Sequence, residues 1–275
     1  MNNRLLVSLT KAFSWLSKKT TDILLPQEPR VKTLEALGPD GIFTRIPRAE
    51  NFDFPTDKIK AIFCYKNPLC RQAIWEIKYR GNPQLILDFS LLLYDYILED
   101  LSDLAAFHNF TNIILLPIPS APARKKEKGF NQCELLARAL AKIDRERNGN
   151  NFTLWEDFLL KKTDTLHQAR VSNRKKRLKN LTGTFVVNGN QSLDSRAWPS
   201  NRNNSLRLTQ TCPPPKVGRR ANHSESFPAI QSLNGLSFII IDDVITTGAT
   251  MTEAFRALRA AGIPPRHIRG YALAH

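Results

Sequence analysis

The chain has 275 residues, with 40 Lys and Arg against 25 Asp and Glu, and a formal net charge of +15. This length can bury a sizeable core in one large domain or two small ones, and a hydrophobic content of 42% is ordinary for a globular protein. The composition excludes a chain that is disordered throughout. The charge indicates anionic ligands, nucleic acid or an acidic partner, although a solvated basic surface explains most of these charges equally well.

The cysteines and histidines show no metal-site spacing. The four cysteines, Cys64, Cys70, Cys133 and Cys212, form no Cys-x-x-Cys pair, and the five histidines show no ligand pattern. We therefore expect neither a zinc ribbon nor a disulfide framework, but reduced thiols in a cytoplasmic protein. No apolar run in the sequence is long enough to span a bilayer.

The first 59 residues differ in pattern from the rest of the chain. Apolar residues recur at helical spacing over residues 4–18, which predicts a helix packed on the body or a loose N-terminal arm, with a membrane-surface helix as the alternative. Residues 20–58 are rich in proline and charge, and we expect irregular structure there. This gives an N-terminal region over residues 1–59 and one domain over residues 60–275.

Helical and strand-like patterns then alternate. Apolar side chains recur at helical spacing over residues 70–81 and 83–99, and each stretch predicts a helix. Residues 112–119 hold four successive large apolar residues, which is typical of a strand buried on both faces. Strand-like residues return at 184–187 and 268–274. This alternation predicts an α/β fold with a mainly parallel sheet flanked by helices.

A cationic segment follows the strand predicted at residues 112–119. It carries Arg124, Lys125, Lys126 and Lys128, and a helical pattern begins soon after it. A strand, a cationic loop and a helix together can form an anion site, in which fixed Arg and Lys charges suit a diphosphate. Taken alone, the segment is better explained as a solvated charged loop.

Two later stretches are distinctive in composition. Residues 190–232 are rich in Asn, Ser, Pro and Arg, and we expect them to form a disordered insertion. A basic run precedes the insertion and could bind nucleic acid through phosphates, without any motif for reading sequence. The run consists of Arg174, Lys175, Lys176, Arg177 and Lys179.

The most informative stretch is the apolar run 238–241, which predicts a second buried strand. It ends in two carboxylates, Asp242 and Asp243, followed by a hydroxyl-rich turn over residues 246–250 and a helical pattern. Backbone N–H groups and hydroxyls at a helix N-terminus favour a phosphate, and Gly248 lets the backbone approach it. The acids suit sugar hydroxyls or Mg²⁺. A ligand with a phosphate at one end and a ribose at the other fits both halves.

The acidic turn and the cationic segment each follow the carboxyl end of a predicted strand. Ligands of parallel α/β sheets bind at this edge. We therefore expect the two segments to converge on one crevice.

Asp242 to Thr250, with the apolar strand before it, resembles the phosphoribosyl-pyrophosphate (PRPP) signature of the type I phosphoribosyltransferases. A generic strand that enters a helix explains neither the double acid nor the hydroxyl-rich turn. The resemblance implies a type I phosphoribosyltransferase-like fold. It also implies displacement of pyrophosphate from ribose C1 by a nitrogen nucleophile, with Mg²⁺ as cofactor.

Four further segments resemble the ComF family, at residues 77–81, 116–124, 128–132 and 166–185, in the order found in that family. ComF-like proteins are linked to natural competence and DNA uptake. Members often begin with a cysteine-rich segment that binds zinc. No cysteine occurs near residues 24–29, so no direct zinc ligation is predicted.

Carried over by position, the resemblance assigns roles to individual residues. Asp242 and Asp243 would bind the ribose hydroxyls, directly or through Mg²⁺, and would form the catalytic set with Arg124. Arg124 and Lys128 would lie near the pyrophosphate. The 5′-phosphate would lie in the turn made by Thr246, Thr247, Gly248, Ala249 and Thr250.

Three functional hypotheses remain open. The first is a Mg²⁺-dependent phosphoribosyltransferase with an unidentified acceptor. The second is a non-catalytic accessory protein of DNA uptake that binds PRPP or a nucleotide and acts through partner proteins. The third is direct binding of single-stranded DNA through residues 174–179 and the basic loops, which predicts a strong salt dependence.

Overall fold

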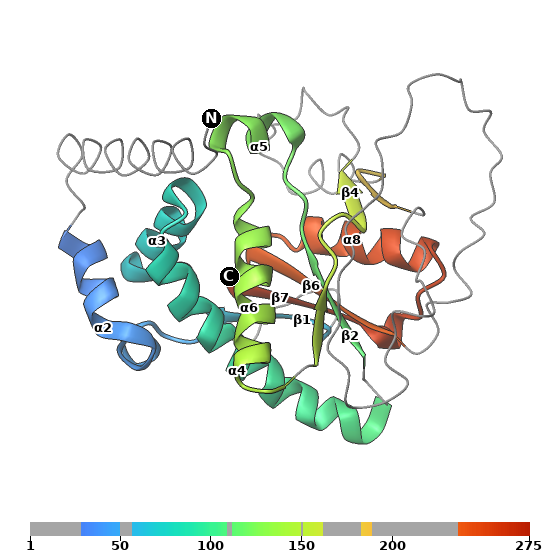
Figure 1. Cartoon of the computed structure of the whole chain (residues 1–275), viewed down its shortest axis with the longest axis horizontal. Helices are drawn as coiled ribbons and strands as arrows, with labels where there is room; N and C mark the ends of the chain where they lie inside the picture. Colours follow the sequence, from blue (N-terminus) through green and yellow to red (C-terminus); the bar gives the residue numbers. More distant parts are fainter. Residues whose placement is uncertain (1–28, 50–56, 109–111, 150, 162–182, 189–235) are drawn as a thin grey trace, which may run out of the picture.

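The computed structural model describes residues 29–49, 57–108, 112–149, 151–161, 183–188 and 236–275. Five strands form one sheet in the order β1-β7-β6-β2-β3, and each neighbouring pair in it is parallel (Figure 1). A small antiparallel pair, β4 with β5, lies apart from this sheet. The strands are β1 (Ile59–Phe63), β2 (Ile113–Pro117), β3 (Phe152–Leu154), β4 (Leu159–Lys161), β5 (Phe185–Val187), β6 (Ser237–Val244) and β7 (Ile268–Ala274).

Helices cover both faces of the sheet. One core joins α2, α3, α4 and α6 to one face, and a second core joins α8 to the other. In Figure 1, α6 crosses in front of the strands and α8 lies behind them. The helices are α2 (Pro29–Arg45), α3 (Pro68–Trp75), the π-helix η1 (Glu76–Arg80), α4 (Pro83–His108), α5 (Pro122–Lys128), α6 (Gln132–Glu146), α8 (Ala249–Ala260) and the 3₁₀-helix η3 (Pro265–His267).

The central strand β6 explains why the apolar run in the sequence has no polar alternation. Ile239 and Ile241 enter the core beneath α4 and α6, whereas Phe238 and Ile240 enter the core beneath α8. All four side chains are fully buried. Because successive side chains of a strand point to opposite faces, a strand covered on both sides is apolar at every position.

The predicted α/β architecture with a mainly parallel sheet is confirmed. The helix expected at residues 70–81 begins at Pro68 and becomes a π-helix from Glu76 onwards, and the helix expected at 83–99 continues to His108. The strands expected near residues 112–119, 184–187, 238–241 and 268–274 are β2, β5, β6 and β7.

The expectation of irregular structure over residues 20–58 was wrong for α2. This helix is kinked at Gly38, whose φ of 60° and ψ of −176° are not helical, and Pro39 follows directly. Val31, Leu34 and Ile42 lie on either side of the kink and are buried in the same core as α4. A glycine and a proline between the two helical pieces interrupt the periodicity, so the sequence pattern missed the element.

The cationic segment was also misjudged as a loop, since residues 122–128 form helix α5. Pro122 begins this helix, where a missing backbone N–H costs nothing, and Gly129 ends it at a φ of 78°. The helix predicted at residues 4–18, the basic run 174–179 and the insertion 190–232 lie outside the described residues.

Candidate active site at the carboxyl edge of the sheet

The two acids lie where β6 reaches the edge of the sheet. Asp242 still pairs with Ala272 of β7, so the backbone is in strand conformation where the carboxylates begin. Asp242 is 7% exposed and Asp243 is 4% exposed. Buried carboxylates need partners, because desolvating an unpaired charge is costly.

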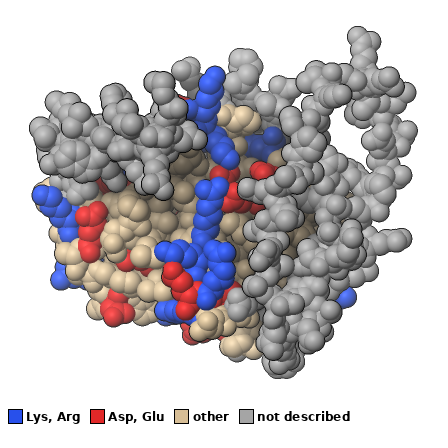
Figure 2. Space-filling view, viewed as in Figure 1, with Lys and Arg blue, Asp and Glu red and all other residues tan. Residues whose placement is uncertain are grey.

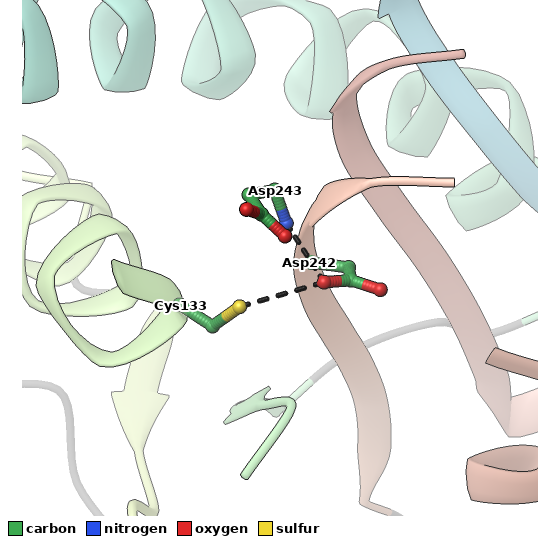
Figure 3. Close-up of side chains that lie close together, drawn as sticks. All are labelled: Cys133, Asp242 and Asp243. Atoms are coloured by element: carbon green, nitrogen blue, oxygen red, sulfur yellow. Dashed lines mark hydrogen bonds between the residues drawn. The ribbon is translucent and has the colours of Figure 1, made fainter. Parts of the chain in front are cut away.

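Each acid has different partners. Asp242 Oδ1 accepts from the Asp243 backbone N–H at 2.9 Å and from Cys133 Sγ, on α6, at 3.5 Å (Figure 3). Asp243 Oδ2 accepts from Gln132 Nε2 at 3.3 Å and lies 3.6 Å from Lys78 Nζ. Asp243 therefore faces a cation, whereas Asp242 faces a thiol.

Protonation follows from these surroundings. Burial raises the pKa of Asp242 well above its ordinary value, and the neighbouring charge of Asp243 raises it further. Burial also raises the pKa of the Cys133 thiol well above its ordinary value, and Asp242 and Asp243 add to this shift. Burial would lower the pKa of Lys78, but the carboxylates of Asp243 and Asp242 outweigh it, so its pKa is raised. The site thus holds a charged lysine against an acid pair in which Asp242 takes up a proton readily.

The carboxylate pair is the place where a divalent cation would fit. One ligand atom each from Asp242, Asp243 and Cys133 lies within 4.8 Å of the others. Carboxylate oxygens are hard ligands of the kind that Mg²⁺ prefers, and Mg²⁺ is commonly held by one or two carboxylates together with substrate phosphates. The protonated thiol of Cys133 does not suit Mg²⁺, so only the two acids are candidate ligands.

The hydroxyl-rich turn leads from β6 into α8. Gly248 adopts a φ of 71° and a ψ of 0° and directly precedes the helix. Such a left-handed backbone is strained for a residue with a side chain, which explains a glycine at this position. Thr247 Oγ1 accepts from the Ala249 backbone N–H at 3.4 Å. The turn therefore places hydroxyls and the positive end of the α8 dipole beside the acids.

Helix α5 supplies positive charge at the end of β2. Figure 2 shows Lys and Arg side chains in a band over α5 and α6, with acidic side chains among them. Arg124 is exposed, whereas Lys125 forms an ion pair with Glu134 at 2.8 Å. Burial and the nearby charges of Lys78 and Arg124 lower the pKa of Lys128, and Asp243 partly offsets this. The cations of α5 therefore lie within electrostatic reach of the acid pair.

A π-helix positions Lys78. Segment η1 ends at Gly81, whose φ is 59°, and a Cβ at this glycine would come within 3.2 Å of the Phe130 ring. Lys128 Nζ donates to the Lys78 carbonyl at 3.2 Å. The segments 77–81 and 128–132, far apart in sequence, thus pack against each other beside the acids. An isolated π turn often marks a functional site.

The structure brings together most of the residues predicted from the sequence. Asp242, Asp243 and Lys128 lie near one another. Arg124 is near enough to Lys128 for its charge to lower the pKa of that lysine. Thr246 is exposed at the end of β6, and the turn continues through Thr247, Gly248, Ala249 and Thr250. The predicted nucleic-acid run 174–179 lies outside the described residues, so its position relative to this site is not described.

Four further residues belong to the site but were not assigned to it from the sequence. Lys78, Gln132 and Cys133 contact the acids, and Lys161 on β4 lies within electrostatic reach of Arg124 and Asp242. Burial, followed by the charge of Arg124, lowers the pKa of Lys161, and Asp242 opposes this shift. Lys78 and Gln132 lie within two of the ComF-like segments, and this was the available signal. Lys161 lies in a short strand without any motif.

Comparison with known proteins shows what the chain is similar to. No family model matches it. The competence protein ComFC of Bacillus subtilis (strain 168) is 23% identical over 203 residues, which amount to 74% of this chain. This distant similarity supports the resemblance to the ComF family. The match spans 58% of the length of ComFC, a little over half of that protein.

A helix that crosses a bilayer needs about 20 mostly apolar residues. Among the described residues, no helix combines the length and the apolar character that crossing a bilayer requires. The longest of them, α4, runs over 26 residues and carries acids along its length.

Proposed function

We propose that the chain binds PRPP at the carboxyl edge of its sheet and transfers phosphoribose to a nitrogen nucleophile. The observation that carries this proposal is that an acid pair, a hydroxyl-rich helix N-terminus and a cationic helix meet at one edge. PRPP carries ribose hydroxyls, a 5′-phosphate and a pyrophosphate, which match these three elements in turn. Among common metabolites, this combination of groups is distinctive.

Each group of the protein has a role in this proposal. Asp242 and Asp243 hold the ribose hydroxyls, and the turn from Thr246 to Thr250 holds the 5′-phosphate. Arg124 and Lys128 lie beside the pyrophosphate and stabilise the negative charge that it gains as it leaves. Fixing the sugar between these groups lowers the entropic cost of bringing the nucleophile to C1.

Mg²⁺ fits this scheme as a cofactor. Asp242 and Asp243 would hold it, and when bound it would supply positive charge to the leaving pyrophosphate. Lys78 already neutralises Asp243 at 3.6 Å. When Mg²⁺ and PRPP bind, we therefore expect Lys78 either to move away from Asp243 or to share this carboxylate with the metal.

Pyrophosphate release tests the catalytic part of the proposal. The chain is incubated with PRPP, Mg²⁺ and a panel of nitrogen bases and amines, and released pyrophosphate is measured. We expect release with the parent chain and with Asp157→Asn, which changes an exposed acid outside the proposed set of site residues, and none with Asp243→Asn. PRPP binding without release for any acceptor would contradict catalysis.

That last outcome would favour a second function, a non-catalytic PRPP- or nucleotide-binding protein that serves DNA uptake. The name of its relative, a competence protein, supports a role of this kind. Partner proteins of DNA uptake or single-stranded DNA would then bind the basic surface of the chain, whose net charge is +15. Binding to an oligonucleotide that weakens steeply with added salt would support the nucleic-acid form of this alternative.

A further inference from the structure

A groove of about 530 Å³ lies along α3 and the π-helix η1. Its volume is in the range of small-molecule sites. The groove combines exposed aromatic rings with positive charge. The side chains on which the argument rests are Arg30, Arg71, Trp75, Lys78, Tyr79 and Arg80, and we refer to them as the aromatic groove.

The aromatic pair in this groove is unusually exposed. Trp75 is 44% exposed and Tyr79 is 52% exposed, so two of the five most exposed large apolar side chains among the described residues lie in one groove. Their ring centroids are 5.4 Å apart, because residues four apart share a helix face. Exposed aromatic rings offer flat surfaces on which another planar ring can stack.

Positive charge surrounds these rings. Four cations line the groove, namely Arg30, Arg71, Lys78 and Arg80. The guanidinium of Arg80 lies 5.3 Å from the centre of the Trp75 ring. One acid, Glu76, is also part of the lining, but it is only 1% exposed and lies 3.5 Å from Arg80. The surface therefore complements a planar ring that carries a negative charge.

Lys78 connects the aromatic groove with the acid pair. It lines the groove, and its Nζ lies 3.6 Å from Asp243 Oδ2. A molecule in the groove would therefore lie next to a sugar whose hydroxyls are held by Asp242 and Asp243. An acceptor of phosphoribose must lie next to this sugar.

We propose that the aromatic groove is the acceptor subsite and that it takes an anionic aromatic heterocycle. This inference rests on the proposed transfer reaction. A ring nitrogen uses its lone pair to form a bond to ribose C1, while the bond from C1 to the pyrophosphate oxygen breaks and pyrophosphate leaves with the electron pair. Where the nitrogen carries a hydrogen, that proton passes to water. Trp75 and Tyr79 stack on the ring, and Arg71 and Arg30 attract its acidic group.

Three small molecules test the contributions of the aromatic ring and of the negative charge separately. Nicotinate carries both an aromatic ring and a carboxylate, nicotinamide has the ring without the charge, and cyclohexanecarboxylate has the charge without the aromatic ring. Each is titrated into the full ¹⁵N-labelled chain, which has four tryptophans, and the indole N–H signal of Trp75 is assigned with Trp75→Phe. We expect saturable shifts of this signal with nicotinate, and at least threefold weaker binding of the other two probes.

Variants test the location of the site. Trp75→Leu should weaken nicotinate binding about tenfold, in keeping with what one stacked ring contributes. Phe43→Leu is the matched control, because Phe43 is 42% exposed and has Arg48 at 4.7 Å over its ring, yet it does not line the groove. Binding to this control should stay within twofold of the parent. Arg71→Gln should weaken nicotinate more than nicotinamide.

Several results would overturn the inference. These are no shift of the Trp75 signal, equal affinity in Trp75→Leu, or nicotinamide binding as tightly as nicotinate. An oligothymidylate that binds through Trp75 when nicotinate does not would assign the groove to a nucleic-acid strand instead. PRPP binding is measured separately by calorimetry. Nicotinate binding without PRPP binding would contradict the acceptor role and the proposed function, whereas the reverse would contradict the groove alone.

Discussion

The turn after β6 and the helix after β2 lie at the ends of neighbouring parallel strands. They present different chemical groups to an anion. The turn offers its own backbone and hydroxyls, with Gly248 and Ala249 buried. Helix α5 offers exposed cations on flexible side chains. The difference indicates that one half of the site recognises a phosphate by fixed geometry and the other half by charge.

This difference determines how each half should respond to salt. Exposed charges are screened within about 8 Å at physiological ionic strength. Buried backbone donors and buried acids are screened much less. Variants of α5 should therefore act strongly only at low salt, whereas variants of the turn and the acids should act at any salt concentration.

The largest effect on PRPP affinity is expected at Asp243, the acid that lies near both halves of the site. Asp243→Asn keeps the size of the side chain but removes the charge that faces Lys78, and leaves that lysine without its counter-ion. We expect PRPP affinity to fall on the order of 100-fold, in line with the loss of charged hydrogen bonds in a buried site. Calorimetry measures the affinity, and circular dichroism verifies the fold. Parent-like PRPP affinity in Asp243→Asn would remove this acid from the site.

The cations of α5 come next. Arg124→Gln and Lys128→Gln should each weaken PRPP binding roughly tenfold at low salt, because each removes a charge–phosphate interaction. Ribose 5-phosphate lacks the pyrophosphate, so its affinity should change less than twofold in both variants. Lys126→Gln is the control, since Lys126 is exposed on the same helix and has no assigned contact with ligand. An equal loss for both ligands would show that α5 does not face the pyrophosphate.

A smaller effect is expected in the turn. Gly248→Ala forces a side chain into a left-handed backbone, which costs roughly 1–2 kcal/mol, and should weaken both PRPP and ribose 5-phosphate several-fold. Gly262→Ala is the control for backbone strain. Gly262 has a φ of 88° just after α8, but it lies at the other end of that helix from the turn. Both variants should lose similar unfolding free energy in urea, while only Gly248→Ala loses affinity. Equal affinities in the two would argue against a phosphate at the turn.

The smallest effect concerns stability and pH. The folded-state pKa of Asp242 is raised by burial and by Asp243, so this acid stabilises the fold at low pH and loses that contribution as pH rises through its folded-state pKa. Asp242→Asn should therefore increase the free energy of unfolding at pH 7.5, because it removes a buried charge. The gain should vanish near pH 4, where the parent acid is protonated. Urea unfolding at the two pH values measures the difference, and a variant less stable than the parent at pH 7.5 would contradict it.

Much of the site's framework could be predicted from the sequence, because it depends on local chemistry. A two-sided buried strand needs apolar residues at every position, and 238–241 has them; a left-handed turn needs glycine, and Gly248 provides it. The partners of the acids could not be predicted in this way. Lys78 and Cys133 reach the acid pair from η1 and α6, and only the tertiary packing of these elements shows that they meet.

The elements that were missed have physical explanations of the same kind. Helix α2 is interrupted by Gly38 and Pro39, and its helical pieces become stable because they pack against α4. The lysine-rich stretch 122–128 has no apolar stripe, so its pattern is that of a loop, yet Pro122 and Gly129 delimit a short helix. In both cases tertiary packing and capping outweigh periodicity.

Calorimetry with PRPP and Mg²⁺ on the full chain tests the central claim most directly. We predict saturable 1:1 binding that is weakened on the order of 100-fold in Asp243→Asn and is retained in Asp157→Asn. Ribose 5-phosphate should bind the same site more weakly, since it lacks the pyrophosphate that α5 faces. Absence of binding heat with PRPP at millimolar concentration, or equal binding by the parent chain and Asp243→Asn, would contradict the account.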